Sequence, residues 1–278
     1  MSKLLVEKLD GVLEDFDSSK LKKSLTNSDC SILLANEISA EIEKEIAGKT
    51  TTEEIYRIAF EKLKNTEKKT ASRYSLRRSL LGLGPTGFPF ERFIAKIFDK
   101  KGYKTKTGIT LNGSCVTHEV DVVAVDDDDL ILCEVKFHNN IKTKTDTKVA
   151  LYIKARYDDL KEKEYTFFGN TMKPTKGLII TNTKFTNNAK KYAKCVDLGI
   201  ISWDYPKRGN LYDLIEETEI QPITSLVSAT KSEKENMIRH DIIDCKDLIN
   251  NPKLLSKIGF PKNKILKITK EAKNICSK

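Results

Sequence analysis

The stretch from His118 to His138 constrains the fold most, because it holds two runs of alternating apolar and polar residues separated by four aspartates. Alternation of this kind, rich in valine, is typical of a half-buried β-strand, and the run Asp126–Asp129 is typical of a turn. Folding this hairpin symmetrically about its turn places Val125 opposite Leu130. A two-residue loop and a four-residue loop give the same register.

This register brings two acidic side chains to opposite positions. Asp121 faces Glu134, and directly opposed side chains of an antiparallel pair have Cβ atoms about 4.5–5.5 Å apart. Two carboxylates this close, beside a buried strand face, need a proton or a cation between them. A hard divalent ion with oxygen ligands meets that need, Mg²⁺ first and Mn²⁺ as the alternative. Lys136 lies on the same strand face as Glu134, where its ammonium group can orient a water or stabilise developing negative charge.

Asp121 followed by Glu134-x-Lys136 on the next strand resembles the PD-(D/E)xK signature of nucleases, in the Mrr-like branch of the restriction endonucleases. Val120 replaces the proline of the family name. The resemblance implies an α/β fold with a mixed sheet in the element order αβββαβ. It also implies that the protein hydrolyses DNA phosphodiester bonds and that Asp121 and Glu134 hold the metal. The alternative is a salt-bridged hairpin in which Lys136 neutralises Glu119 or Glu134.

Helices before and after the hairpin are expected to add residues to this site. The helix within residues 87–104 has an apolar stripe, and Glu91 lies beside it. In the resembling fold, an acid at this position lies near the metal. Arg156, on the inner face of the helix after the hairpin, can bind a scissile phosphate bidentately. It can equally pair with Asp158, Asp159 or Glu91.

Residues 1–82 predict a small, mostly helical domain that begins with a hairpin. The turn signal Asp10-Gly11 separates two short apolar runs that are expected to be strands, and helices follow. Asp17 or Ser18 can cap the first helix, and Thr52 is expected to cap a later one.

The hairpin and its first helix carry the pattern Val6-x-Lys8-x-Asp10-Gly11, then Phe16-Asp17-x-x-Lys20-Leu21. This pattern resembles the ATP-cone, the nucleotide-sensing domain of ribonucleotide reductases and their repressor. The resemblance implies that ATP or dATP binds as an allosteric ligand. The residues that it places at the nucleotide are Val6, Lys8, Glu14, Asp17, Lys20 and Thr52.

One residue departs from the ATP-cone pattern. Leu9 stands where the family usually has an arginine, which removes a charge from the site. The nucleotide affinity and the preference between ATP and dATP therefore stay open. Lysines near a helix N-terminus suit phosphate oxygens, and the alternative is a lysine-flanked hairpin that only packs.

A segment rich in glycine and proline, residues 82–89, marks a domain boundary. The nuclease-like domain is expected over residues 88–220. Its last part alternates strand, helix and strand with continuous apolar runs, which predicts a parallel crossover at the far edge of the sheet.

Residues 221–278 predict a small basic helical module. The formal net charge of the chain is +9, and residues 222–278 contain twelve basic and six acidic residues. Such an excess favours a polyanionic partner, here DNA. A solvated basic face or a helical cap on the nuclease sheet is the alternative. Helices are expected over 224–229, 232–240, 245–249 and 252–275.

Composition excludes several classes of protein. With 39% apolar residues the chain can form real cores. It lacks a run of about eighteen apolar residues that could cross a membrane, and its start lacks the apolar segment of a signal peptide. The six cysteines are scattered without a CxxC pair, which favours a cytoplasmic protein with reduced thiols over a zinc site or a disulfide framework.

Together these features predict an α/β metal-dependent DNA endonuclease that is regulated by ATP or dATP and acts in defence against foreign DNA. The alternative is a nucleotide-responsive DNA-binding regulator with an inert nuclease core. The presence of Asp121, Glu134 and Lys136 together favours the enzyme. The DNA substrate, homo-oligomer formation and the direction of the nucleotide effect stay open.

Overall fold

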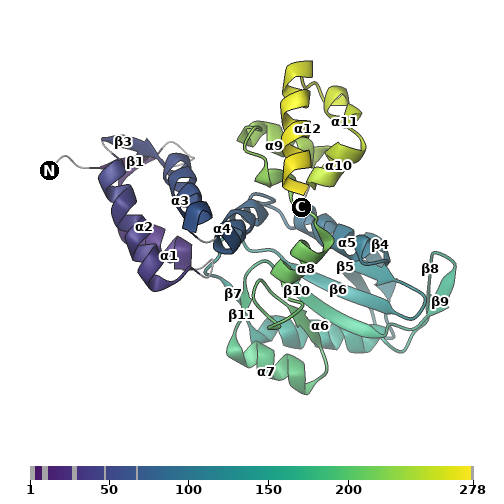
Figure 1. Ribbon diagram of the computed structural model, residues 1–278. Coiled ribbons are helices and arrows are strands. Elements are labelled where there is room, and N and C mark those ends of the chain that lie inside the picture. The colour runs from purple at the N-terminus through teal and green to yellow at the C-terminus, as the bar shows by residue number, and fades with distance from the viewer. Residues whose placement is uncertain (1–3, 8–11, 27–29, 47, 67, 277–278) are drawn as a thin grey trace. The chain divides into compact units, whose positions relative to one another are not determined.

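The computed structural model describes residues 4–7, 12–26, 30–46, 48–66 and 68–276 (Figure 1). The chain divides into two compact units, Met1–Arg78 and Ser79–Lys278. The boundary falls inside helix α4 (Lys68–Leu81). The expected Asp10-Gly11 turn lies outside the described residues.

The first unit combines a small sheet with helices. Strand β1 (Leu5–Glu7) pairs antiparallel with β2 (Leu13–Asp15) and parallel with β3 (Lys49–Thr51). Strand β3 was not expected from the sequence, because its three residues are polar and become a strand only through pairing with β1. The helices of this unit are α1 (Ser18–Thr26), α2 (Ile32–Glu45), α3 (Thr52–Thr66) and the first part of α4.

Side-chain caps define where two of these helices begin. Asp17 Oδ1 accepts a hydrogen bond from Ser19 N at 2.9 Å, so Asp17 is the cap of α1. The prediction that Thr52 caps α3 is wrong, since Thr51 Oγ1 accepts the hydrogen bond from Glu54 N at 3.1 Å. Because β3 ends at Thr51, that residue is the last one before the helix, and Thr52 is already helical.

A five-stranded mixed sheet forms the centre of the second unit, in the order β12-β10-β6-β5-β4. Neighbouring strands from β4 to β6 are antiparallel, whereas β6, β10 and β12 are parallel. The predicted αβββαβ order and the parallel crossover at the sheet edge are therefore confirmed. The strands are β4 (Lys104–Asn112), β5 (Thr117–Val125), β6 (Leu130–Lys136), β10 (Lys176–Thr181) and β12 (Gly199–Ile201). Short two-stranded ribbons, β7 (Lys144–Thr145) with β11 (Lys184–Phe185) and β8 (Tyr165–Phe167) with β9 (Asn170–Met172), complete the strands.

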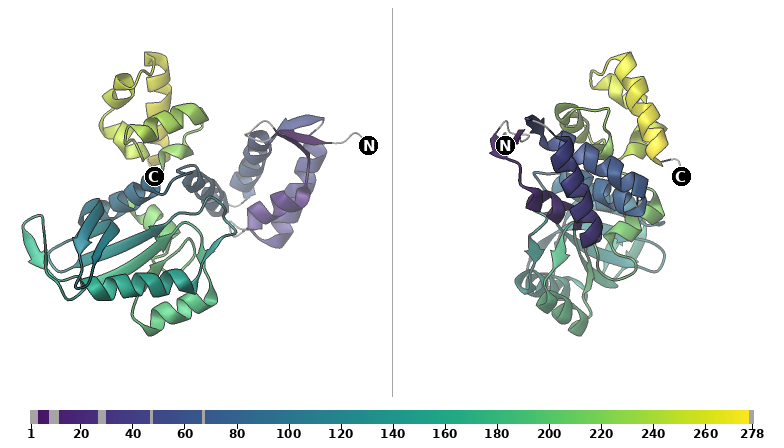
Figure 2. Two further views of the ribbon diagram at one scale, coloured as in Figure 1. Left: turned by 180° about the vertical axis from the view of Figure 1, so that it is seen from behind. Right: turned by 60° about the vertical axis from the view of Figure 1, so that its left-hand side comes forward.

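Helices cover both faces of this sheet (Figures 1 and 2). Helix α5 (Phe88–Lys100) lies on one face, and α6 (Thr147–Leu160) and α7 (Asn187–Cys195) lie on the other. As a result β6 is buried on both faces from Leu130 to Val135. The expectation of a half-buried strand is wrong for β6, because a sheet between two helical layers has no solvated face.

The β5–β6 hairpin has the predicted register. Val125 pairs with Leu130, and the pairing continues to Val122 opposite Cys133. The loop has four residues, and Asp126 N donates to Asp129 O at 3.0 Å. Asp126 Oδ1 also accepts hydrogen bonds from the backbone N–H groups of Asp128 and Asp129. The aspartates thus form the turn through their own side chains.

The C-terminal segment is helical, with two departures from expectation. The predicted helix over 224–229 is wrong, since only a 3-10 turn, Ile223–Ser225, forms there. The expected helical stretch over 252–275 divides in two, because Gly259 has φ 89° and Pro261 follows it. Helix α8 (Leu211–Thr218) precedes this segment, whose helices are α9 (Lys231–Arg239), α10 (Cys245–Asn250), α11 (Lys253–Lys257) and α12 (Lys262–Cys276).

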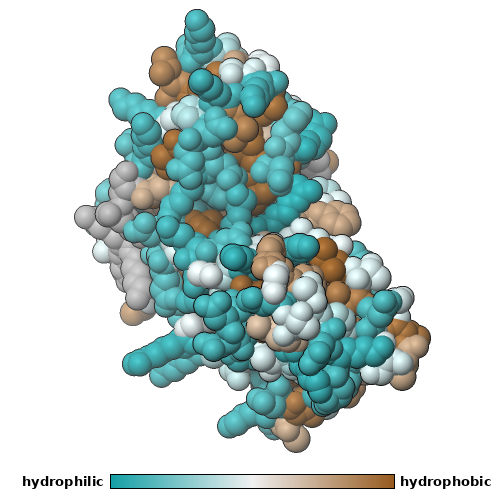
Figure 3. Space-filling model, turned by 90° about the vertical axis from the view of Figure 1, so that its right-hand side faces the viewer, coloured by the Kyte–Doolittle hydropathy of each residue, from teal (hydrophilic) through white to brown (hydrophobic). Residues whose placement is uncertain are grey.

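Hydrophilic side chains cover much of the face shown in Figure 3, and apolar ones occur in small groups. Across the described ranges, every helix is too short or too polar to span a membrane.

Asp159, near the end of α6, holds the loop between β4 and β5. Its carboxylate accepts hydrogen bonds from Cys115 N at 2.8 Å and Val116 N at 3.3 Å, and His118 Nε2 lies 2.8 Å from Oδ2. The His118 contact, then the Cys115 and Val116 donors, hold the pKa of Asp159 well below its usual range.

We predict that Asp159→Ala lowers the melting temperature at neutral pH. A lowered carboxyl pKa stabilises the fold fully above the ordinary aspartate pKa of about 4, and this stabilisation is lost as pH falls through the lowered value. The difference between wild type and variant, measured by thermal melting, should therefore shrink in acid. Asp158→Ala, which removes an exposed carboxylate, is the control. Equal melting temperatures for Asp159→Ala and wild type at neutral pH would contradict this role.

Candidate active site

Asp121 and Glu134 lie where the pairing of β5 and β6 ends. The last paired positions are Val122 and Cys133, and the same register carries the next step to Asp121 and Glu134. Beyond these positions the backbone N–H of Val135 donates to the Asp121 side chain, at 2.7 Å from Oδ2, instead of to a main-chain carbonyl of β5. The carboxylate is thereby fixed at the point where the two strands part.

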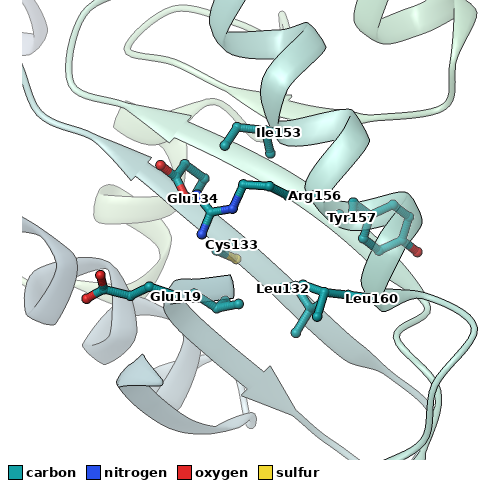
Figure 4. Close-up of a pocket in the computed structure, with 10 residues that line it drawn as sticks. Glu119, Leu132, Cys133, Glu134, Ile153, Arg156, Tyr157 and Leu160 are labelled. Carbon is teal, nitrogen blue, oxygen red and sulfur yellow. Dashed lines mark hydrogen bonds and ion pairs between the residues drawn. The ribbon is translucent and has the colours of Figure 1, made fainter. Parts of the chain in front are cut away.

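Glu134 is almost fully buried, with 6% of its surface exposed, and each of its oxygens contacts a cation. Oε1 contacts Nζ of Lys136, and Oε2 accepts a hydrogen bond from Arg156 Nη1 at 2.8 Å. Figure 4 shows Arg156 extending from α6 toward Glu134, with Glu119 apart from this pair. Of the two partners that the sequence allows for Lys136, Glu119 and Glu134, the structure has Glu134.

The carboxylate that pairs with Arg156 is not among those the sequence suggested. Asp159 instead binds the β4–β5 loop, and Asp158 pairs with lysines on its own helix. Arg156 lies on the face of α6 that packs against the sheet, so its partner comes from β6. This partner could not be read from spacing along the helix, because it depends on how α6 packs.

Glu91 brings a third carboxylate to the site from the first turn of α5. Burial, and next the negative charges of Asp121, Glu119 and Glu134, together raise the pKa of Glu91 to about 7. Burial likewise raises the pKa of Asp121 to about 6, together with the charge of Glu134. The cations of Lys136 and Arg156 sit on Glu134, so the side of the site with Asp121 and Glu91 keeps an excess of negative charge.

These acids fit a hard divalent ion. Mg²⁺ in proteins is commonly held by one or two carboxylates, with waters and substrate phosphates completing its shell. Asp121 and Glu134 are the two carboxylates at hand. Within the described ranges, no three His, Cys, Asp or Glu side chains converge into a ready-made metal cage. The donor set therefore suits an ion that also takes ligands from a substrate.

Polar residues follow β6 and β10 beside the site, and of these Asn182 was not predicted from the sequence. Asn182 and His138 exchange hydrogen bonds, with Oδ1 accepting from His138 N at 2.8 Å and Nδ2 donating to His138 O at 2.9 Å. Asn182 is buried and follows β10 directly. A polar residue at the carboxyl end of a parallel strand is a signal that could have found it.

The glycine-proline segment packs against the chain that follows Lys136. Asn139 Nδ2 donates to Pro85 O at 3.0 Å, and a Cβ at Gly84 would lie 2.3 Å from Asn139 Oδ1 and 2.8 Å from the Phe137 ring. Only glycine fits at residue 84 with this packing. The segment before α5 is therefore in direct contact with the end of β6.

In the first unit, the described residues of the expected nucleotide site gather around the hairpin. Val6 is paired with Glu14 across the strands, and Glu14 binds Lys20 Nζ at 3.0 Å. Thr52 Oγ1 donates to Glu7 O at 3.3 Å, which joins α3 to β1. Asp17 is the cap of α1, as given above. Lys8 and the divergent Leu9 lie outside the described residues.

Comparisons with known proteins match three successive segments of the chain. Family models match residues 4–81 as an ATP cone domain, 85–207 as a restriction endonuclease and 222–276 as an AF1548-like C-terminal domain. An uncharacterised protein of Archaeoglobus fulgidus is 33% identical over 183 residues, which is 66% of this chain and 99% of the relative. The chain belongs to the AF1548-like family. It carries an ATP cone domain followed by a restriction endonuclease domain, as both resemblances predicted.

Solved structures give the same relationship. The crystal structure of AF1548, a protein of unknown function, is 32% identical with a TM-score of 0.57 and covers 69% of this chain and 98% of its own. Can2 from Sulfobacillus thermosulfidooxidans, solved with cyclic tetra-adenylate, is 14% identical with a TM-score of 0.29 over 66% of this chain and 49% of its own. The second similarity is too low to support an argument about this AF1548-like protein.

We predict that Glu91→Gln stabilises the metal-free protein at about pH 8 but not at about pH 4. A carboxyl whose pKa is raised to about 7 costs folding free energy once it is deprotonated. This cost is absent below the ordinary glutamate pKa of about 4.3 and grows until pH passes the raised value. Thermal melting in EDTA at both pH values measures the difference. Glu164→Gln, at an exposed position, is the control, and a pH-independent effect of Glu91→Gln would contradict a raised pKa of Glu91.

Proposed function

We propose that the restriction endonuclease domain is an active, metal-dependent DNA endonuclease that hydrolyses phosphodiester bonds. The observation that carries this proposal is the crowding of partly buried carboxyls at Asp121 and Glu91, since burial first and the neighbouring negative charges next raise the pKa of both. Such crowding opposes folding, so an inert core would gain stability by losing one acid. A regulator that only binds DNA has no need of it. Perturbed carboxyls beside a lysine favour the enzyme.

In this proposal Asp121 and Glu134 would hold Mg²⁺ or Mn²⁺. When bound, the ion supplies charge stabilisation at the phosphoryl oxygen and a more acidic water. Lys136 orients that water or stabilises negative charge that develops on the phosphate. Arg156 donates to a phosphate oxygen through its planar fork, and Glu91 can hold a proton near neutral pH. We place this activity in the cytoplasm, in defence against foreign DNA.

We further propose that ATP or dATP bound by the ATP cone regulates the nuclease. Val6, Glu14, Asp17, Lys20 and Thr52, together with Lys8, would form the nucleotide site. The linker after α4 provides a route, because Pro85 contacts Asn139, three residues beyond Lys136, and the same segment leads into the helix of Glu91. The domains in this proposal are residues 1–82, 88–220 and 221–278.

The basic C-terminal module is proposed to hold DNA without reading its sequence. Acidic residues of the module face α5, since Asp244 and Asp247 bind Lys96 at 3.1 and 2.5 Å. With these charges used inside the fold, the outer surface is more basic than the composition alone indicates. Exposed lysines on α11 and α12 suit phosphate contacts, namely Lys253, Lys257, Lys262, Lys267 and Lys270.

Removing any one of Asp121, Glu134 or Lys136 should abolish cleavage while DNA binding persists. We expect Asp121→Asn, Glu134→Gln and Lys136→Met to lower the rate of plasmid cleavage by at least about a hundredfold. The first two remove a carboxylate that would hold the metal, and the third removes the ammonium group that stabilises negative charge on the reacting phosphate. Their affinity for labelled DNA, measured by fluorescence anisotropy, should change little from that of wild type. Asp127→Asn, in the exposed turn of the same hairpin, should cleave like wild type. Cleavage near the wild-type rate by any of the three site variants would refute the assignment.

Nucleotide should change the cleavage rate or the oligomeric state about fivefold or more without being hydrolysed, the usual size of a coupling between sites. Calorimetry with a non-hydrolysable ATP analogue and with dATP measures binding, and light scattering measures assembly. Lys20→Ala should weaken binding, whereas Lys23→Ala, exposed on the same helix, should not. If neither nucleotide binds the wild-type protein, the first domain is a packing module rather than a sensor.

A further inference from the structure

We infer that Arg156 blocks the metal site in the free protein and is released from it by DNA. This inference rests on the proposed function, because it assigns Arg156 a role toward the ion that Asp121 and Glu134 would hold. Arg156 is then a positioning residue that links metal binding to substrate binding.

The block follows from the occupancy of Glu134. Both carboxylate oxygens are engaged, one by Lys136 and the other by Arg156 at 2.8 Å. The side chains of Arg156 and Glu134 are 14% and 7% exposed, so water does little to loosen their pairing. A cation that takes Glu134 as a ligand must compete with this guanidinium for Oε2. The free protein should therefore bind a divalent ion weakly.

Release requires another anion, because a partly buried arginine stays charged and cannot simply lose its partner. A DNA phosphate is the partner of matching geometry, since the guanidinium fork binds phosphate bidentately. A small open space lies beside the ion pair. A cavity of about 20 Å³, with space for about one water, is lined by Glu119, Glu134 and Arg156. On the same helix, the Tyr152 ring lies 5.4 Å from the Arg156 guanidinium carbon.

If Arg156 exchanges Glu134 for a DNA phosphate, the binding of metal and the binding of DNA become cooperative. When the phosphate takes Arg156, Oε2 of Glu134 becomes available, and the ion then meets two carboxylates and the bound phosphate. By linkage, DNA must strengthen metal binding by the same factor as metal strengthens DNA binding. A general electrostatic effect of Arg156 differs, since it would weaken metal binding equally with and without DNA.

The test is calorimetric titration of Ca²⁺ into the full-length protein, with and without a short linear duplex that is shown to stay intact. In wild type we expect the duplex to increase Ca²⁺ affinity by about tenfold or more. Arg156→Met should bind Ca²⁺ about tenfold more tightly than wild type without DNA, and the duplex should then add much less. Arg156→Lys, which keeps the charge without the fork, should lie between them, and melting curves check that each variant folds.

Lys154→Met is the matched control, because it removes a cation from the same helix that pairs with Asp158 and not with Glu134. It should keep the wild-type dependence on DNA. The inference is overturned if Arg156→Met keeps that dependence too, or binds Ca²⁺ more weakly than wild type. Asp121→Asn separates this failure from failure of the proposed function. If Asp121→Asn binds Ca²⁺ as wild type does, the metal assignment itself is wrong.

Discussion

The site depends on one constraint, the meeting of two carboxylates at the end of an antiparallel strand pair. The β5–β6 register puts Asp121 and Glu134 one residue beyond the last paired positions, Val122 and Cys133. The hydrogen bond from Val135 N to Asp121 Oδ2 fixes the Asp121 carboxylate there. Helices on both faces then remove water from the sheet, so the charges are poorly screened. Lys136 and Arg156 supply positive charge to this group of carboxylates.

The response is uneven. Glu134 receives two cations from the chain, Lys136 on its own strand and Arg156 from α6. Burial, and next the charge of Glu134, raise the pKa of Asp121 to about 6, although the hydrogen bond from Val135 N lowers it. Burial, and next the charges of the neighbouring carboxylates, raise the pKa of Glu91 to about 7. A site that is neutralised on one side and charge-rich on the other is suited to a cation that arrives with an anionic substrate.

Patterns within short stretches of sequence predicted the features that depend on neighbouring residues. Strand alternation and the aspartate turn gave the hairpin register, and continuous apolar runs gave the parallel edge of the sheet. Features set by contacts between distant segments were not predictable in this way. Strand β3 exists because β1 pairs with it, β6 is buried on both faces because α5 and α6 cover it, and Arg156 binds Glu134 because of how α6 lies on the sheet. The nucleotide role rests on resemblance to a family, whereas the metal role rests both on the register that opposes Asp121 and Glu134 and on a family resemblance.

The most direct test of the central claim is cleavage of supercoiled plasmid by the purified full-length protein, with Mg²⁺ or Mn²⁺ and with EDTA. If the domain is a metal-dependent nuclease, we expect nicked or linear DNA only when the divalent ion is present, and none from the Asp121→Asn variant under the same conditions. This claim would be contradicted if no divalent ion supports cleavage while salt-sensitive DNA binding persists and responds to nucleotide. That outcome would make this AF1548-like protein a DNA-binding regulator.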